Sequence, residues 1–305
     1  MRTRKNCGRL LALCAACCLL SAKGLQRVSM RQDEASLQDL IHACSKMMTP
    51  LGQTELDSPG ELVWQLLSLT DHIFVLAKGD CVIGAPSMHR AKVTCVHGEV
   101  IDMCAPAKFF YGPHSHAMRV TFSHAVILQV AKEKQYRNVA IVEDDLTFIN
   151  RRMSTDVVRE FNKLLASSSW SLIRFGFRPY FLQHDAETHC PAKCRCTFGA
   201  FGEHFCQMNR RGCDLRSSDL YIVHSRHFAL LQSMLLDLRV SNSKRIIDLH
   251  PMRSFENQWL VIPQISFQST LDVPTDYQLG SGALYIKKCV GPRPLPSELL
   301  ESALF

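Results

Sequence analysis

Three consecutive acids, Glu143, Asp144 and Asp145, are the clearest candidates for chemistry in this sequence. Carboxylates in a row repel one another, and a divalent cation bound among them removes that cost. Oxygen ligands favour Mg²⁺ or Mn²⁺, which proteins hold through one or two carboxylates together with substrate phosphates. The alternative is that the tripeptide is only a solvated turn.

The element that must position these acids is a strand. Residues 139–142 form an apolar, β-branched run that stops at Glu143, which predicts a buried strand. Because side chains alternate between the two faces of a strand, we expect Glu143 and Asp145 to face the same way, roughly 6–7 Å apart. Strand ends in open α/β sheets are where ligand crevices form. This context favours a binding site over a bare turn.

A helix is predicted just before that strand. Ser123 is a good N-cap, and His124, Leu128 and Gln135 follow it at helical spacing. A helix, a short turn and a buried strand that ends in acids are typical of a layered α/β domain. His124 is a candidate site residue, with a capping or packing role as the alternative.

Residues 119–149 also resemble a known family. Their pattern is Ser-His, a helix rich in Ala and Leu, and an apolar strand ending in Glu-Asp-Asp. It is similar to the central signature of glycosyltransferase family 25, which includes lipooligosaccharide and collagen-modifying galactosyltransferases. Weaker similarities follow in the family's order, at residues 170–176, 218–223, 247–248 and 261–268. The chain departs from the pattern just before Ser123, where the family usually has Gly-Cys.

The resemblance implies a GT-A-like α/β domain, with a mostly parallel twisted sheet flanked by helices. It implies transfer of a hexose, with galactose as the guess, from a UDP-sugar to a hydroxyl of a glycan or glycoprotein, assisted by Mn²⁺ or Mg²⁺. The implied metal ligands are Asp145 and Glu143. The residues expected to bind the nucleotide-sugar are Glu143, Asp144, Ser123 and His124.

An inverting reaction, which the resemblance also implies, needs a base outside the acid triplet. Asp248 is the first candidate for this catalytic role and Asp219 the second. The rival hypothesis is a non-catalytic lumenal carbohydrate- or protein-binding domain of the same fold.

The net charge of +7 comes from the N-terminus. Residues 1–32 carry seven of the 35 Lys and Arg residues and no acid, which leaves 28 basic and 28 acidic residues beyond them. This balance argues against nucleic acid as a partner. The basic start and the apolar run at residues 10–20 predict a secretory signal peptide or an uncleaved signal anchor, with an organelle transit peptide as the alternative. A membrane association is expected only for the uncleaved anchor.

Ten of the 14 cysteines follow this leader. An even number behind a secretory leader predicts disulfides and a lumenal location in the endoplasmic reticulum or Golgi, or secretion. The cysteine-rich residues 190–213 leave zinc open as an alternative. The domain boundaries we expect are a leader at 1–32, a helical approach region at 33–70, the glycosyltransferase domain at 71–288 with a cysteine-rich insertion at 186–214, and a tail at 289–305.

Overall fold

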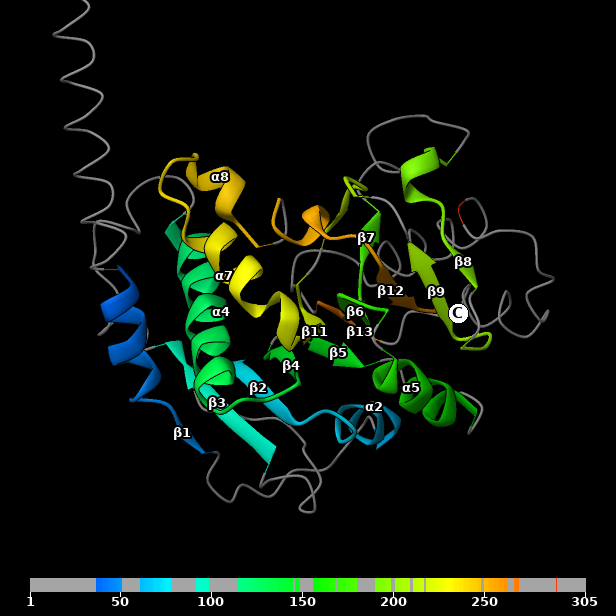
Figure 1. Ribbon diagram of the computed structural model, residues 1–305, viewed down its shortest axis with the longest axis horizontal. Helices are drawn as coiled ribbons and strands as arrows, with labels where there is room; N and C mark the ends of the chain where they lie inside the picture. The colour runs from blue at the N-terminus through cyan, green and yellow to red at the C-terminus, as the bar shows by residue number, and fades with distance from the viewer. Residues whose placement is uncertain are drawn as a thin grey trace, which may run out of the picture.

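The computed structural model has a nine-stranded sheet covered by helices on both faces, as Figure 1 shows. It is an α/β architecture of layers around one sheet, as the sequence predicts. The residues that the structure describes are 37–50, 61–77, 92–98, 115–144, 146–148, 156–167, 169–179, 190–198, 201–208, 211–216, 218–247, 250–262, 266–268 and 289.

The main sheet has the strand order β1-β3-β2-β4-β11-β6-β12-β9-β8. These strands are β1 (Thr49–Pro50), β3 (Val93–His97), β2 (His72–Ala77), β4 (Asn138–Glu143), β11 (Leu220–His224), β6 (Leu172–Arg174), β12 (Gln258–Val261), β9 (Phe205–Met208) and β8 (Thr197–Phe198). Two small antiparallel pairs accompany it: β7 (Arg178–Pro179) with β10 (Leu215–Arg216), and β5 (Leu146–Phe148) with β13 (Ser266–Gln268).

The expectation of a mostly parallel sheet is wrong. Only the pairs β3–β2, β2–β4 and β6–β12 are parallel, and the other pairings of the main sheet are antiparallel. A parallel neighbour needs a crossover connection, usually a helix. The chain between β6 and β11 is instead the cysteine-rich segment, and β11 returns antiparallel to both β6 and β4.

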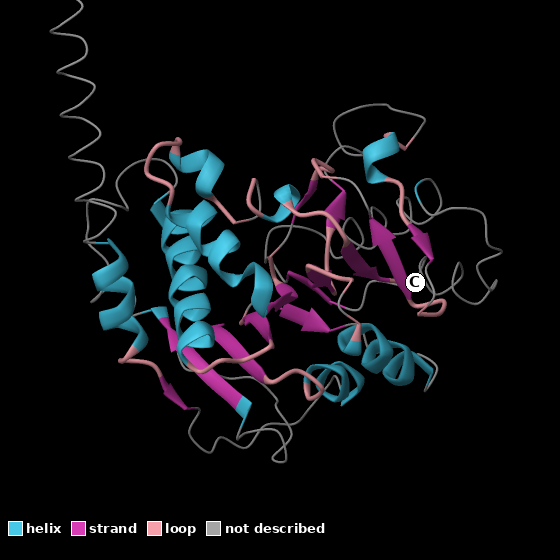
Figure 2. Cartoon of the chain, in the orientation of Figure 1, coloured by secondary structure: helices cyan, strands magenta, loops and turns pink. Residues whose placement is uncertain are grey.

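Helices cover the two faces of the sheet unequally. One face packs against the helical residues 37–45, α4 (Ser115–Glu133) and α7 (Phe228–Leu236), and the other packs against α2 (Glu61–Leu67) and α5 (Asp156–Ala166). The short helix α8 (Asn242–Arg245) and the 3₁₀ turns η3 (Ala192–Cys194), η4 (Ser225–His227) and η5 (Met252–Ser254) complete the described elements. Figure 2 shows these helices and strands by type.

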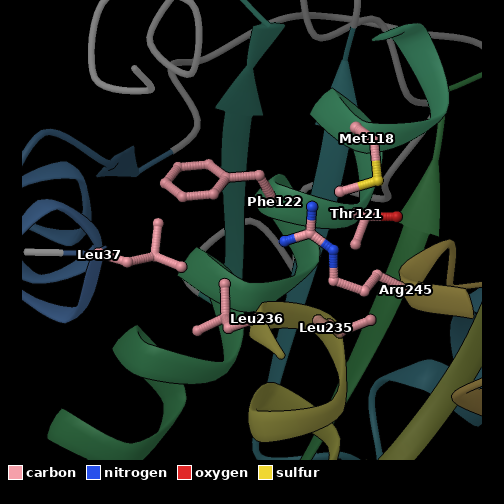
Figure 3. Close-up of a pocket in the computed structure, with 7 residues that line it drawn as sticks. All are labelled: Leu37, Met118, Thr121, Phe122, Leu235, Leu236 and Arg245. Atoms are coloured by element: carbon pink, nitrogen blue, oxygen red, sulfur yellow. The ribbon is translucent and has the colours of Figure 1, made fainter. Parts of the chain in front are cut away.

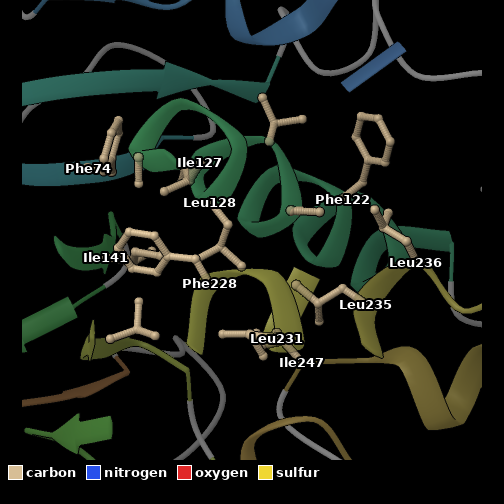
Figure 4. Packing of buried hydrophobic residues seen from close by; sticks show 14 of the residues in the cluster. Phe74, Phe122, Ile127, Leu128, Ile141, Phe228, Leu231, Leu235, Leu236 and Ile247 are labelled. Atoms are coloured by element: carbon tan, nitrogen blue, oxygen red, sulfur yellow. The ribbon is translucent and has the colours of Figure 1, made fainter. Parts of the chain in front are cut away.

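In strand β4, successive side chains point alternately into the two apolar clusters on the opposite faces of the sheet. Val139 and Ile141 belong to the apolar cluster under α4 and α7, while Ala140 and Val142 belong to the cluster under α2 and α5. Figure 4 shows the first cluster between the sheet and these helices. Both faces of the strand are buried, as the continuous apolar run predicts. The same alternation points Glu143 toward α4.

Helix α4 begins earlier than the sequence suggests. It starts at Ser115, eight residues before the predicted N-cap at Ser123, and it ends at Glu133. Most of its residues from Met118 to Ala131 are buried, because α7 and residues 37–45 pack on it from outside the sheet. A helix that is buried on nearly all sides has no clean polar stripe, so its start is hard to read from periodicity.

Three disulfides fasten the cysteine-rich part of the chain. They join Cys190 to Cys289, Cys194 to Cys213 and Cys196 to Cys206. Disulfides therefore occupy all five cysteines of residues 190–213, which leaves no thiolate there for the alternative zinc site. Strands β8 and β9 of this segment extend the main sheet beyond β12, so it forms a sheet edge as well as an insertion.

The disulfides are compatible with a secretory or extracellular protein, since such bonds persist in oxidising compartments. In the part of the chain that the structure describes, no helix is long and apolar enough to cross a membrane. The predicted leader lies outside the described residues.

Candidate functional site

The acids lie at the carboxyl end of β4, in the parallel part of the sheet. Strand β4 ends at Glu143, and Asp144 continues in a turn with an exposed side chain. The backbone N–H of Asp144 still donates to the carbonyl of Leu76 in β2, at 2.9 Å. Asp145 lies outside the described residues, so its predicted facing relative to Glu143 stays a prediction.

The boundary between β2 and β4 is the point where the sheet connections diverge. The chain leaves β2 toward β3 on one side, and it leaves β4 toward α5 and β6 on the other. The crossover helices lie on opposite faces, α4 before β4 and α5 after it. In doubly wound sheets, ligands bind in the crevice outside the carboxyl ends of the strands at this switch point. Glu143 and Asp144 lie at that place.

Two side chains of the protein approach the same oxygen of the Glu143 carboxylate. The hydroxyl of Ser218, just before β11, donates to Oε1 of Glu143 at 2.7 Å. The ring Nε2 of His124 in α4 lies 3.4 Å from the same oxygen. The side chain of Glu143 is 14% exposed and that of His124 is 0% exposed. The Glu143 side chain is thus mostly buried, with Ser218 and His124 beside one of its carboxylate oxygens.

Tyr221 of β11 completes this arrangement. Its hydroxyl lies 2.9 Å from Nδ1 of His124, and the two rings stack at a centroid distance of 5.6 Å. Tyr221 is fully buried among apolar side chains. A buried tyrosine normally directs its hydroxyl to a hydrogen-bond partner. Here that partner is the histidine that approaches Glu143.

The two candidate bases have different outcomes. Asp219 is buried, and its backbone carbonyl accepts the N–H of Glu143 at 2.8 Å. The structure therefore brings Asp219 beside the acids. Asp248 lies outside the described residues. The N–H of the preceding Ile247 donates to Thr121 of α4 at 3.2 Å, so this segment approaches α4 one turn before His124.

The prediction that Ser123 is the N-cap of this helix is wrong, and its predicted role toward the nucleotide-sugar stays a prediction. Ser123 lies in the middle of α4, is buried, and donates its hydroxyl to the carbonyl of Arg119 at 3.0 Å. A serine inside a helix commonly bonds the carbonyl four residues earlier. His124, which follows it, is the member of the Ser-His pair that reaches the acids.

Among the described residues, the acids do not by themselves form a cation site. In the described ranges no group of three or more His, Cys, Asp or Glu side chains is arranged to hold a metal ion, and Asp145 lies outside them. Glu143 and Asp144 supply carboxylate oxygens. Mg²⁺ and Mn²⁺ accept such oxygens and commonly take one or two protein carboxylates plus substrate phosphates.

A separate small pocket lies among the helical residues 37–45, α4, α7 and α8, as Figure 3 shows. It is lined by Leu37, Met118, Thr121, Phe122, Leu235, Leu236 and Arg245. Burial lowers the pKa of Arg245, and the nearby Asp237 partly offsets that effect. The lining contains no carboxylate, so this pocket is not the candidate site.

Sequence reasoning missed Ser218 and Tyr221 as site residues. Both lie in the segment at 218–223, in which Asp219 is the one sequence-predicted site residue. The available signal was a tyrosine inside an otherwise apolar strand, since its hydroxyl needs a buried partner. The partner itself is 97 residues away, in α4, and no local pattern identifies it.

No protein-family model matches this chain, and no curated protein matches it.

Proposed function

We propose that this protein is a glycosyltransferase of GT-A type, which transfers a hexose from a UDP-sugar to a hydroxyl of a glycan or glycoprotein. One observation carries the proposal. Two features that the family resemblance marks, the histidine after Ser123 and the first acid of the triplet, lie 3.4 Å apart at the switch point of the sheet. A chance tripeptide in a solvated turn would have no such support.

Each residue has a distinct part in this mechanism. Glu143, oriented by Ser218 and His124, and Asp144, which is exposed beside it, present carboxylate oxygens to the crevice. With Asp145 these side chains would hold Mn²⁺ or Mg²⁺ and the sugar hydroxyls of the donor. The cation supplies Lewis-acid stabilisation of negative charge on the departing diphosphate.

The acceptor hydroxyl must lose a proton as it attacks the sugar. A carboxylate on the acceptor side takes that proton. Asp248 remains the first candidate, because the burial of Asp219 leaves its carboxylate little access to an incoming acceptor. Galactose is the guess for the sugar and inversion the guess for the stereochemistry, both from the resemblance.

The test is a donor screen with the disulfide-bonded full chain, measuring nucleotide release from UDP-hexoses with and without Mn²⁺. We expect Mn²⁺-dependent release that Asp145→Asn abolishes, because that change removes a charged oxygen ligand. Asp39→Asn, in an exposed helical residue, is the matched control and should retain turnover. Full turnover in Asp145→Asn at saturating Mn²⁺ would reject the assignment.

The rival function, a non-catalytic binding domain of the same fold, gives a different result. It would bind a carbohydrate or protein without consuming any UDP-sugar, and Asp145→Asn would not alter that binding. A folded, monodisperse chain that neither releases UDP nor binds it with Mn²⁺ would favour this rival.

A further inference from the structure

Four side chains form a continuous polar chain that ends at the candidate site. Tyr221 contacts His124 at 2.9 Å, His124 lies 3.4 Å from Glu143, and Ser218 donates to Glu143 at 2.7 Å. The four come from α4, β4 and β11 with the residues just before it, so tertiary packing alone brings them together. Ser218 lies just before β11 and contacts Glu143 directly, whereas Tyr221 lies within β11 and contacts His124.

Burial increases along this chain away from the crevice. Tyr221 and His124 are each 0% exposed and Ser218 is 2% exposed, while the Glu143 side chain reaches solvent. Tyr221 lies in the apolar cluster under α4, together with residues such as Ile127. A phenylalanine or leucine at position 221 would fill this space without burying a polar group. Buried polar groups cost free energy unless they are hydrogen-bonded. Their presence here needs a purpose beyond packing.

The chemistry of the four groups indicates which of them donate hydrogen bonds and which accept. A carboxylate only accepts hydrogen bonds, so a proton on Nε2 of His124 is the tautomer that suits its 3.4 Å approach to Glu143. Nδ1 then meets the Tyr221 hydroxyl, which can rotate to complement it. The stacked rings, 27° apart in plane, restrict how His124 can turn. Tyr221 therefore fixes the ring that faces Glu143.

We propose that Tyr221 and Ser218 are positioning residues, which hold the Glu143 carboxylate in one orientation for the cation-bound diphosphate of a nucleotide-sugar. This inference rests on the proposed function. Groups that orient a metal-binding carboxylate typically change metal affinity or activity 10–100-fold when they are removed. Both side chains are buried, so in this proposal each acts through Glu143.

The experiment measures the affinity of the full disulfide-bonded chain for UDP with Mn²⁺, the donor KM and kcat, and the melting temperature. Tyr221→Phe and Ser218→Ala should each weaken UDP–Mn²⁺ binding and raise the donor KM by roughly 10–100-fold, with a smaller fall in kcat. Tyr136→Phe is the tyrosine control, because it removes the hydroxyl of a half-buried tyrosine that lies just after the end of α4. It should change the UDP–Mn²⁺ affinity by less than about twofold. Ser233→Ala, an exposed serine of α7, is the corresponding serine control.

A double variant separates positioning from a general loss of structure. In a Glu143→Gln background, Tyr221→Phe should weaken UDP–Mn²⁺ binding by less than a further twofold or so. The reason is that Tyr221 acts on the ligand through the Glu143 carboxylate, which this background has already removed. An equal loss in both backgrounds would overturn the inference, as would tight UDP–Mn²⁺ binding by Tyr221→Phe with only a lower melting temperature. If the wild-type chain itself fails to bind UDP with Mn²⁺, the proposed function fails and the positioning role falls with it.

Discussion

Two regions of this molecule are held together by different means. The α/β part around β2, β4 and β11 is stabilised by two large apolar clusters, one on each face of the sheet. The crosslinked edge, made of β8 and β9 together with the neighbouring pair β7–β10, has a small third cluster of eleven buried residues, of which six are disulfide-bonded cysteines. Covalent links there replace much of the apolar area that the edge lacks.

Strand length explains the difference. Strands β2 and β4 have six residues each, whereas β7, β8 and β10 have two. A two-residue strand buries too little apolar surface to offset the entropy of ordering the chain around it. The candidate site lies in the apolar part, on long strands whose register is well specified. The crosslinked edge supplies no carboxylate to that site among the described residues.

The largest loss of stability should come from removing the disulfide that closes the longest loop. Replacing Cys190 and Cys289 by serine opens a loop with a sequence separation of 99 residues, against 19 for Cys194–Cys213 and 10 for Cys196–Cys206. Loop entropy predicts losses of about 4.7, 3.2 and 2.7 kcal/mol respectively. Denaturant unfolding of the three double-serine variants checks this order.

Limited proteolysis of the Cys190/Cys289 variant sharpens the comparison. We expect new cleavage within residues 190–213 while α4 and β4 stay protected, because their packing does not involve these cysteines. Early cleavage in α4 would show that the two regions unfold as one unit.

The apolar part should respond to acid. Burial, and then Lys92 and Lys134, lower the pKa of His72 in β2 from 6.5 to about 4. The unfolded chain takes up this proton below pH 6.5 and the folded chain only near pH 4. Stability from this group is therefore complete above pH 6.5 and is lost as the pH falls to 4, by up to about 3 kcal/mol.

Urea unfolding of the chain at several pH values from 7.5 to 4 measures this loss. His72→Asn should flatten the decline in that window, while the exposed His250→Gln should leave it unchanged. An equally steep decline in His72→Asn would assign the acid sensitivity to other groups, of which His224 and His227, with pKa values also lowered by burial, come first.

A smaller effect is expected where the two regions meet. Oε2 of Glu160 in α5 accepts from the backbone N–H of His204 at 3.2 Å and lies 2.9 Å from its Nδ1. Gly202 has φ of +113°, and a side chain there would collide with the Glu160 carboxylate. Glu160→Gln should cost about 2 kcal/mol, because it weakens charged hydrogen bonds in a largely buried place.

The matched control for Glu160→Gln is Glu203→Gln, a neutralised acid in the same loop that is exposed and should cost less than about 0.5 kcal/mol. Urea unfolding measures both. Equal costs would indicate that the junction between α5 and the crosslinked edge depends on apolar contacts instead, such as Phe161 against Phe205.

The sequence predicts the elements better than their arrangement. The continuous apolar run at residues 139–142 predicts β4, and the structure confirms it within a residue at each end. The directions of the strands depend on whether a helix or a crosslinked segment joins them, and periodicity does not contain that information. For the same reason the sequence predicts His124 and Glu143 as site residues separately, from their own motifs. Tyr221 and Ser218 can be recognised as site residues only once β11 is paired with β4.

Ser123 gives the smallest expected effect and the sharpest contrast between sequence and structure. As an N-cap, its replacement by alanine would cost about 1 kcal/mol. In mid-helix the change removes a bond to the Arg119 carbonyl and introduces the best helix former, so the two effects nearly cancel and stability should stay within about 0.5 kcal/mol. Urea unfolding of Ser123→Ala distinguishes these values. Its affinity for UDP with Mn²⁺ should also match the wild type, because the hydroxyl is directed into α4. A tenfold weaker affinity with normal stability would return Ser123 to the ligand site and require the start of α4 to be reassigned.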